Sequence, residues 1–231
     1  PDNVFKKIKI GDILDIGFDD LKAKVYKINQ INILLKTISS GKLENNKGIN
    51  ISNRSITLNY LTKKDIEAIK IAKELNIKNY ALSFTNSIKD IKRFNKLLPN
   101  TNNIFKLESK KAIKNLKTII PAANNFLIDR GDLSKEIKIE NVPIIQKIIF
   151  KIVKKFKNKK NIYIATNLLE SMLVNKYPSR AEANDIFSNL ESGAKGLVLA
   201  AETAIGKYPE ASVNFIIKMI NSFNRQVKFK L

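Results

Sequence analysis

Strand-like and helix-like segments alternate regularly through most of this chain, from about residue 62 onward. Short apolar runs such as Phe126-Leu127-Ile128 stop at polar turns, and longer amphipathic stretches follow them. This alternation is typical of a parallel sheet covered by helices. It predicts five strands, near residues 80–84, 104–107, 126–128, 162–165 and 196–199. Helices are expected near residues 88–98, 110–119, 143–156, 180–192 and 209–223.

The first fifty residues follow a different pattern. Short β-like runs near residues 13–16, 22–26 and 31–37 are separated by polar turns, which predicts a small β module over residues 1–52. Residues 53–231 then form the second domain, and a capping-box pattern at Thr62 to Asp65 opens its first helix. A closed eightfold β/α barrel usually needs about 250 residues. We therefore expect an α/β fold with a partial TIM-type (β/α) barrel, either open or completed by segments outside this chain.

Composition excludes several kinds of chemistry. The chain has no Cys and no His, so it has no disulfides, no thiolate chemistry and no histidine-based catalysis. A bound metal would have to be a hard cation held by oxygens. The net charge of +21 suits either a general lysine bias or a polyanionic partner such as RNA. The lysines are spread without interleaved aromatic residues, which favours the first explanation. No run is long enough to span a membrane, and no signal peptide is evident.

Charged and polar residues follow several of the predicted strands. Lys106 and Glu108 end the second strand, Asp132 follows the third and Thr166 follows the fourth. The carboxyl ends of parallel strands meet at one edge, so we expect these groups to lie together. Glu108 and Asp132 are suited to Mg²⁺, Lys106 to developing negative charge, and Thr166 to positioning a proton. The alternative is that Lys106 is an ordinary lysine and that the two acids cap helices.

Longer segments around these residues resemble one known family, the pyruvate kinases, and the similarity extends from about residue 10 to residue 223. The most specific segments are GDL at residues 131–133, VPIIQK at 142–147, ATNLLESM at 165–172, PSRAEA at 178–183 and ETAIGKYP at 202–209. The resemblance implies a β/α barrel interrupted by a mobile β lid, here residues 1–52. It also implies transfer of a phosphoryl group from phosphoenolpyruvate to ADP, with Mg²⁺ and K⁺ as cofactors.

The resemblance also assigns roles to residues of this sequence. It implies that Glu108 and Asp132 bind the metal ion, that Lys106 stabilises charge on the transferred phosphoryl group and the enolate oxygen, and that Thr166 helps to deliver the proton that completes pyruvate.

Further roles concern the substrate and the nucleotide. The resemblance implies that the backbone around Arg130 and Gly131, together with Asp132 and Thr166, receives the substrate. Lys47 of the lid segment matches a lysine that contacts nucleotide phosphates.

Two features depart from the family pattern. Asp129 occupies a position where the family has a small residue, and a carboxylate there is expected to repel an anionic substrate. The family's first three barrel strands, which supply the K⁺ ligands, have no counterpart in this sequence. Two hypotheses therefore stay open. The first is a working pyruvate kinase whose missing strands come from a partner chain, in a homo-oligomer or from a complementing chain, or from a further portion of the protein. The second is a catalytically degenerate structural or binding subunit of a larger, ribonucleoprotein-like assembly. The expected location is the cytoplasm or an organelle.

Overall fold

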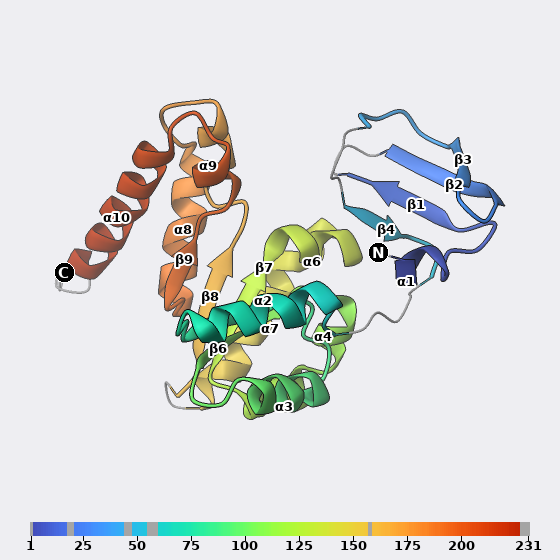
Figure 1. The fold of residues 1–231 in the computed structure, drawn as a ribbon. Helices are drawn as coiled ribbons and strands as arrows, with labels where there is room; N and C mark the ends of the chain where they lie inside the picture. The colour runs from blue at the N-terminus through green and yellow to red at the C-terminus, as the bar shows by residue number, and fades with distance from the viewer. Residues whose placement is uncertain (1, 18–20, 44–47, 55–59, 157–158, 227–231) are drawn as a thin grey trace. The chain divides into compact units, whose positions relative to one another are not determined.

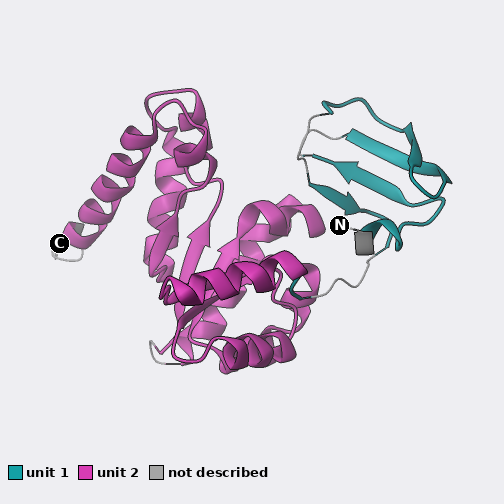
Figure 2. Cartoon of the chain, in the orientation of Figure 1, with its two compact units in different colours: residues 1–62 teal, residues 63–231 magenta. Residues whose placement is uncertain are grey.

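The computed structural model describes residues 2–17, 21–43, 48–54, 60–156 and 159–226. The chain divides into two compact units, Pro1–Thr62 and Lys63–Leu231 (Figure 2). Among the described residues, no helix combines the length and the apolar character needed to cross a membrane.

The first unit is a small antiparallel sheet. A short helix, α1 (Asp2–Phe5), precedes the strands β1 (Ile13–Ile16), β2 (Leu21–Ile28), β3 (Ile33–Thr37) and β4 (Ile49–Ile51). The sheet order is β3-β2-β1-β4. Side chains of β2 alternate between buried and exposed, and Leu21, Ala23 and Val25 form the core with Leu14 and Ile16. The three predicted strands are confirmed, whereas β4 was not predicted because it contains only three residues.

An ion pair joins the residue before β1 to a residue after β4. Arg54, which follows β4, donates from Nε to Asp12 Oδ1 at 2.6 Å, and its Nη2 lies 2.6 Å from Asp12 Oδ2. Asp12 directly precedes β1 and is 3% exposed. The Arg54 guanidinium outweighs the effect of burial and lowers the pKa of the Asp12 carboxyl below its ordinary value. This contact ties the start of β1 to the chain that follows its neighbour β4.

The second unit contains a five-stranded parallel sheet in the order β5-β6-β7-β8-β9 (Figure 1). Its strands are β5 (Asn79–Leu82), β6 (Asn102–Leu107), β7 (Asn125–Asp129), β8 (Asn161–Ala165) and β9 (Gly196–Val198). Its helices are α2 (Lys63–Glu74), α3 (Ile88–Leu97), α4 (Lys110–Lys114), α5 (Leu116–Ile119), α6 (Arg130–Glu136), α7 (Val142–Lys154), α8 (Arg180–Ser192), α9 (Ala201–Ala204) and α10 (Pro209–Gln226), with short 3-10 helices at Ile120–Ala122, Ile139–Asn141 and Glu170–Leu173. The expected class of fold and the five strands are confirmed.

One face of this sheet is tightly packed. Phe105 of β6 aligns with Phe126 of β7, and Phe126 aligns with Ile162 of β8; all three are at most 1% exposed. Phe94 of α3 packs edge-on against Phe105, with ring centroids 6.0 Å apart. Burial of these large side chains holds the strands in register, so their carboxyl ends form one continuous edge.

Two predicted elements differ from the structure. The helix expected over residues 110–119 is two short helices, α4 and α5, because Asn115 ends one and precedes the next. The charged segment after β7 was interpreted as a turn, with the next helix beginning near Pro143. It is instead the helix α6, which begins at Arg130 directly after the strand. The residues expected on a loop therefore lie on the first turn of a helix.

Candidate functional site

The carboxyl ends of β6, β7 and β8 bring together the charged groups singled out in the sequence. Lys106 lies on β6 and Glu108 directly follows it, while Asp129 ends β7 and aligns with Ala165 of β8. Asp132 lies on the first turn of α6. The expected convergence of polar groups at this edge is therefore present in the structure.

The Lys106 ammonium lies between two carboxylates. Its Nζ is 2.9 Å from Glu108 Oε2 and 2.9 Å from Asp129 Oδ2. The side chain of Lys106 is 19% exposed. Burial by itself would lower the pKa of Lys106, but the contacts with Glu108 and Asp129 outweigh it, so the pKa lies above its ordinary value. Lys106 is therefore a fixed positive charge at this edge of the sheet, unlike the many solvent-exposed lysines.

Glu108 is fully buried. Its Oε1 accepts a hydrogen bond of 2.6 Å from the backbone N–H of Phe84, which follows β5. Phe84 has a left-handed backbone with φ of 50°, an uncommon state for an aromatic residue. Burial raises the pKa of the Glu108 carboxyl above its ordinary value, and the Lys106 ammonium and the Phe84 N–H offset this only in part. The fold therefore holds this carboxylate in an environment that disfavours its charge.

Asp129 is the N-cap residue of α6. Its Oδ1 accepts the backbone N–H of Asp132 at 3.3 Å and lies 3.2 Å from Thr166 Oγ1, while Oδ2 faces Lys106. The residue is 7% exposed. The carboxylate expected to repel an anionic substrate is thus held against an ammonium, a hydroxyl and an amide.

The other acids at this edge are not N-caps. Ser109 caps α4 and Asp129 caps α6, so the capping alternative for Glu108 and Asp132 does not apply. Asp132 Oδ1 lies 2.6 Å from Lys135 Nζ. Carboxylate oxygens of Glu108, Asp129 and Asp132 lie within 4.8 Å of one another. Oxygen atoms at this spacing are suited to a hard divalent cation.

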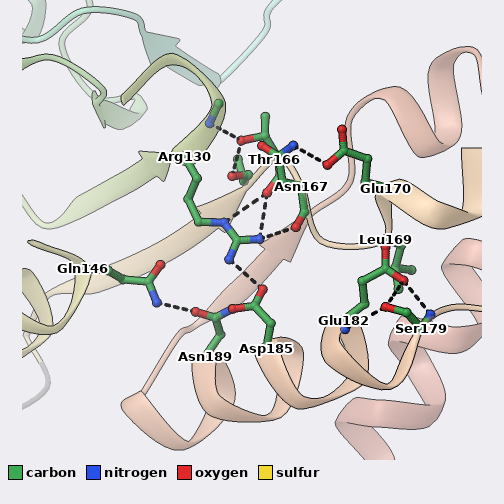
Figure 3. Close-up of polar contacts among 12 residues, drawn as sticks. Arg130, Gln146, Thr166, Asn167, Leu169, Glu170, Ser179, Glu182, Asp185 and Asn189 are labelled. Carbon is green, nitrogen blue, oxygen red and sulfur yellow. Dashed lines mark hydrogen bonds and ion pairs between the residues drawn. The ribbon is translucent and has the colours of Figure 1, made fainter. Parts of the chain in front are cut away.

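Thr166 and Asn167 form a strained turn after β8 (Figure 3). Their φ angles are 67° and 52°, and a positive φ is a genuine outlier for a β-branched residue such as Thr166. The Thr166 hydroxyl accepts the Gly131 N–H at 2.8 Å and lies 2.6 Å from the Ala165 carbonyl oxygen. A Cβ at Gly131 would lie 3.3 Å from Thr166 Oγ1. The turn therefore places Thr166 directly over the start of α6.

Arg130 holds this turn in place (Figure 3). Its guanidinium donates to the Thr166 carbonyl oxygen at 2.8 and 3.1 Å and to the Asn167 carbonyl oxygen at 2.7 Å. Its Nη1 also lies 2.6 Å from Asp185 Oδ2 of α8. The side chain of Arg130 is thus committed to the fold, and the N–H groups of Gly131 and Asp132 already have partners. Arg130, Gly131 and Asp132 were expected to receive the substrate, but in this structure they donate hydrogen bonds to other groups of the protein.

Two further carboxylates support the neighbouring loops. Glu202, on α9 after β9, is 2% exposed and accepts the N–H groups of Leu169 and Ala200 at 3.1 and 2.8 Å. Glu182 of α8 accepts the N–H group of Ser179 at 2.7 Å (Figure 3). It also accepts the N–H group of Ser171 at 2.7 Å. These contacts outweigh burial and lower the pKa of the Glu182 carboxyl. Both acids position loops at the site edge.

Some functional contacts had no signal in the sequence. The interactions of Arg130 with Asp185 and of Phe84 with Glu108 join residues far apart in the chain. Asp129 was noticed only as a departure from the family pattern. Lys47, expected to contact nucleotide phosphates, lies outside the described residues.

Comparison with known proteins identifies the relatives of this chain. Residues 2–213 match the family model described as the barrel domain of pyruvate kinase. A pyruvate kinase of Thermotoga maritima is 32% identical over 231 residues, covering 97% of this chain and 48% of the relative. A pyruvate kinase of Mycobacterium intracellulare is 34% identical, covering 91% of this chain and 45% of the relative. Plastidial pyruvate kinase 2 of Arabidopsis thaliana is 34% identical, covering 90% and 36%.

The extent of these matches matters for their interpretation. The chain spans about half the length, or less, of the curated relatives it matches. The match nevertheless extends over most of both units and includes every residue of the candidate site. The resemblance inferred from the sequence is confirmed, and the chain belongs to the pyruvate kinase family.

Proposed function

We propose that this chain contributes the phosphoryl-transfer site of a pyruvate kinase, which passes the phosphoryl group of phosphoenolpyruvate to ADP to give pyruvate and ATP. The observation that supports this most is the partly buried Lys106 ammonium beside the buried Glu108 carboxylate at the end of β6. Phosphoryl transfer depends mainly on positioning and charge neutralisation, and such a pair provides both.

The residues present fit a divalent cation. Glu108 and Asp132 would hold Mg²⁺, since carboxylate oxygens are its preferred protein ligands and theirs lie within 4.8 Å of each other. When bound, the ion would neutralise the charge of the phosphoryl oxygens. Burial of Glu108 fixes its side chain before any ion arrives. K⁺ has no assigned ligands in this chain.

Two side chains would act on the reacting atoms. Lys106 would stabilise the negative charge that shifts onto the transferred group and then onto the enolate oxygen as the phosphorus–oxygen bond of phosphoenolpyruvate breaks. ADP takes the phosphoryl group, and the enolate carbon then takes a proton to give pyruvate. The Thr166 hydroxyl, fixed by its contacts with Gly131 and Ala165, would help to deliver that proton.

The remaining parts of the site would come from the first unit and from further strands of the barrel. Lys47 and the rest of the first unit would serve the nucleotide as a lid, residues 1–52 forming the lid and residues 53–231 the barrel portion. Strands beyond β5 and β9 would complete the barrel, from the same polypeptide or from a partner subunit.

The test is pyruvate production by the protein in its native assembly, coupled to lactate dehydrogenase. We expect Mg²⁺-dependent activity that Lys106→Met lowers by about a thousandfold or more, because the charge in the transition state loses its partner. Lys160→Met is the matched control. Lys160, which directly precedes β8, is also partly buried, but it donates to the carbonyl oxygens of Pro121 and Ala123, which precede β7, at the opposite end of the sheet.

The outcome separates the two hypotheses. Equal background rates for the unchanged protein and Lys106→Met would refute the proposed phosphoryl transfer. RNA that copurifies and dissociates with salt would instead support a structural subunit of a ribonucleoprotein assembly.

A further inference from the structure

The position of Asp129 among three different donors carries an inference beyond the proposed reaction. The donors are the ammonium of Lys106, the hydroxyl of Thr166 and the backbone N–H of Asp132, and they come from β6, the turn after β8 and α6. An ammonium, a hydroxyl and an amide at one point are what a bound carboxylate or phosphoryl oxygen requires. Here a side chain of the protein itself takes that position.

Helix capping alone does not explain an acid at this point. Among the described helices of the second unit whose N-cap side chain accepts a hydrogen bond, α3, α4 and α8 use the serines Ser87, Ser109 and Ser179. Only α6 uses an acid, Asp129. A serine satisfies the N–H groups of a helix start about as well as an aspartate. The contact of Oδ2 with Lys106 is therefore additional to the cap.

We propose that Asp129 is an internal carboxylate that occupies the anion position of the site and sets how strongly the site binds an anionic substrate. The inference rests on the proposed function, because Lys106 and Thr166 are the residues assigned to the substrate there. An incoming carboxylate or phosphoryl group has to displace Asp129 from these donors, and it meets a like charge if Asp129 stays. Asp129 is thus a specificity-determining residue that lowers the affinity for such groups.

Asp129→Ser tests this directly, because it keeps an N-cap hydroxyl and removes the charge. Binding of phosphoenolpyruvate would be measured by calorimetry at a constant Mg²⁺ concentration. We expect the Kd of Asp129→Ser to be lower than that of the unchanged protein by about tenfold or more. A residue with only a structural role would change Kd in the opposite direction or leave it unchanged.

Asp185→Asn is the control for net charge. The substitution removes the negative charge of Asp185, which pairs with Arg130, and leaves the contacts of Asp129 with Lys106 and Thr166 in place. An equal gain in affinity for phosphoenolpyruvate in Asp185→Asn would overturn the proposal. A Kd of Asp129→Ser within twofold of that of the unchanged protein would also overturn it, and so would the absence of binding by both proteins. Turnover is measured separately. Tighter binding without turnover would support the role of Asp129 and refute the proposed phosphoryl transfer. Turnover with an unchanged Kd would support phosphoryl transfer and refute the role of Asp129.

Discussion

The two ends of the parallel sheet are built from opposite chemistry. At the amino end, β5, β6, β7 and β8 each begin with an asparagine, and these side chains form a ladder: Asn102 donates to Asn79 at 2.9 Å, Asn125 to Asn102 at 2.8 Å and Asn161 to Asn125 at 2.8 Å. At the carboxyl end, β6 and β7 deliver charged groups instead. Within β6, the strand begins at a neutral amide and reaches the ammonium of Lys106 four residues later.

The difference shows how one sheet separates stability from chemistry. The amide ladder joins neighbouring strands through neutral groups that have donors and acceptors for each other. The carboxyl end holds a buried carboxylate whose pKa is raised and residues with left-handed backbones at Phe84, Thr166 and Asn167. Strain and unfavourable charge of this kind cost stability and are common at functional sites. We expect substitutions at the two ends to differ accordingly.

The largest effect on stability is expected from loss of the Arg130 side chain at the carboxyl end. Arg130→Met keeps the apolar stem and removes every contact with Thr166, Asn167 and Asp185. Two carbonyl oxygens and a carboxylate lose their donor, so we expect a loss of about 3 kcal/mol in the free energy of unfolding. Chemical denaturation measures it.

The matched control is Asp185→Asn, which removes only the ion pair. The Asp185 side chain is 38% exposed, so we expect a cost of less than about 1 kcal/mol. Equal costs for the two variants would show that the ion pair, and not the carbonyl contacts, holds the turn.

A smaller effect is expected from breaking the amide ladder at the amino end. Asn102→Ala removes two of its hydrogen bonds and should lower the free energy of unfolding by about 1–2 kcal/mol. Asn79→Ala removes only one and should cost about half as much. Neither change touches the candidate site, so any rate in the coupled lactate dehydrogenase assay should be retained. Equal costs for the inner and the terminal asparagine would argue against a ladder.

The smallest effect concerns the pH dependence of stability. Glu108 has a folded pKa above its ordinary value of 4.5, so the folded state binds this proton more tightly than the unfolded state does. Its contribution therefore becomes less favourable as the pH rises from 4.5 through the raised pKa. Glu108→Gln has no carboxyl to titrate at this position. The free energy of unfolding of the variant, relative to that of the unchanged protein, should therefore increase over that pH interval.

Glu182→Gln provides the control of opposite sign in the same unit. The pKa of Glu182 is lowered in the folded state, so its contribution is lost as the pH falls from 4.5 through the lowered pKa. Denaturation at a series of pH values measures both differences. The same slope for both variants would contradict the assigned environments.

Much of the site edge could be predicted from the sequence. Lys106 and Glu108 are two residues apart in the extended chain at the end of β6, so their side chains point to the same side, and the observed 2.9 Å contact agrees with this. The strand-end rule for parallel sheets placed Asp132 and Thr166 nearby. The role of Asp129 could not be predicted, because a departure from a family pattern does not reveal which donors surround the new side chain.

The sequence alone determined the parts that depend on periodicity: the alternation of strands and helices and the order in which charged groups reach the edge of the sheet. The tertiary structure decided which of these groups contact each other. Arg130 binds the carbonyl groups of Thr166 and Asn167, and Asp129 meets Lys106, only because the turn after β8 has a left-handed backbone and α6 begins directly at the end of β7. Such contacts depend on backbone angles and on distances between segments, and neither is encoded in the spacing of residues along the chain.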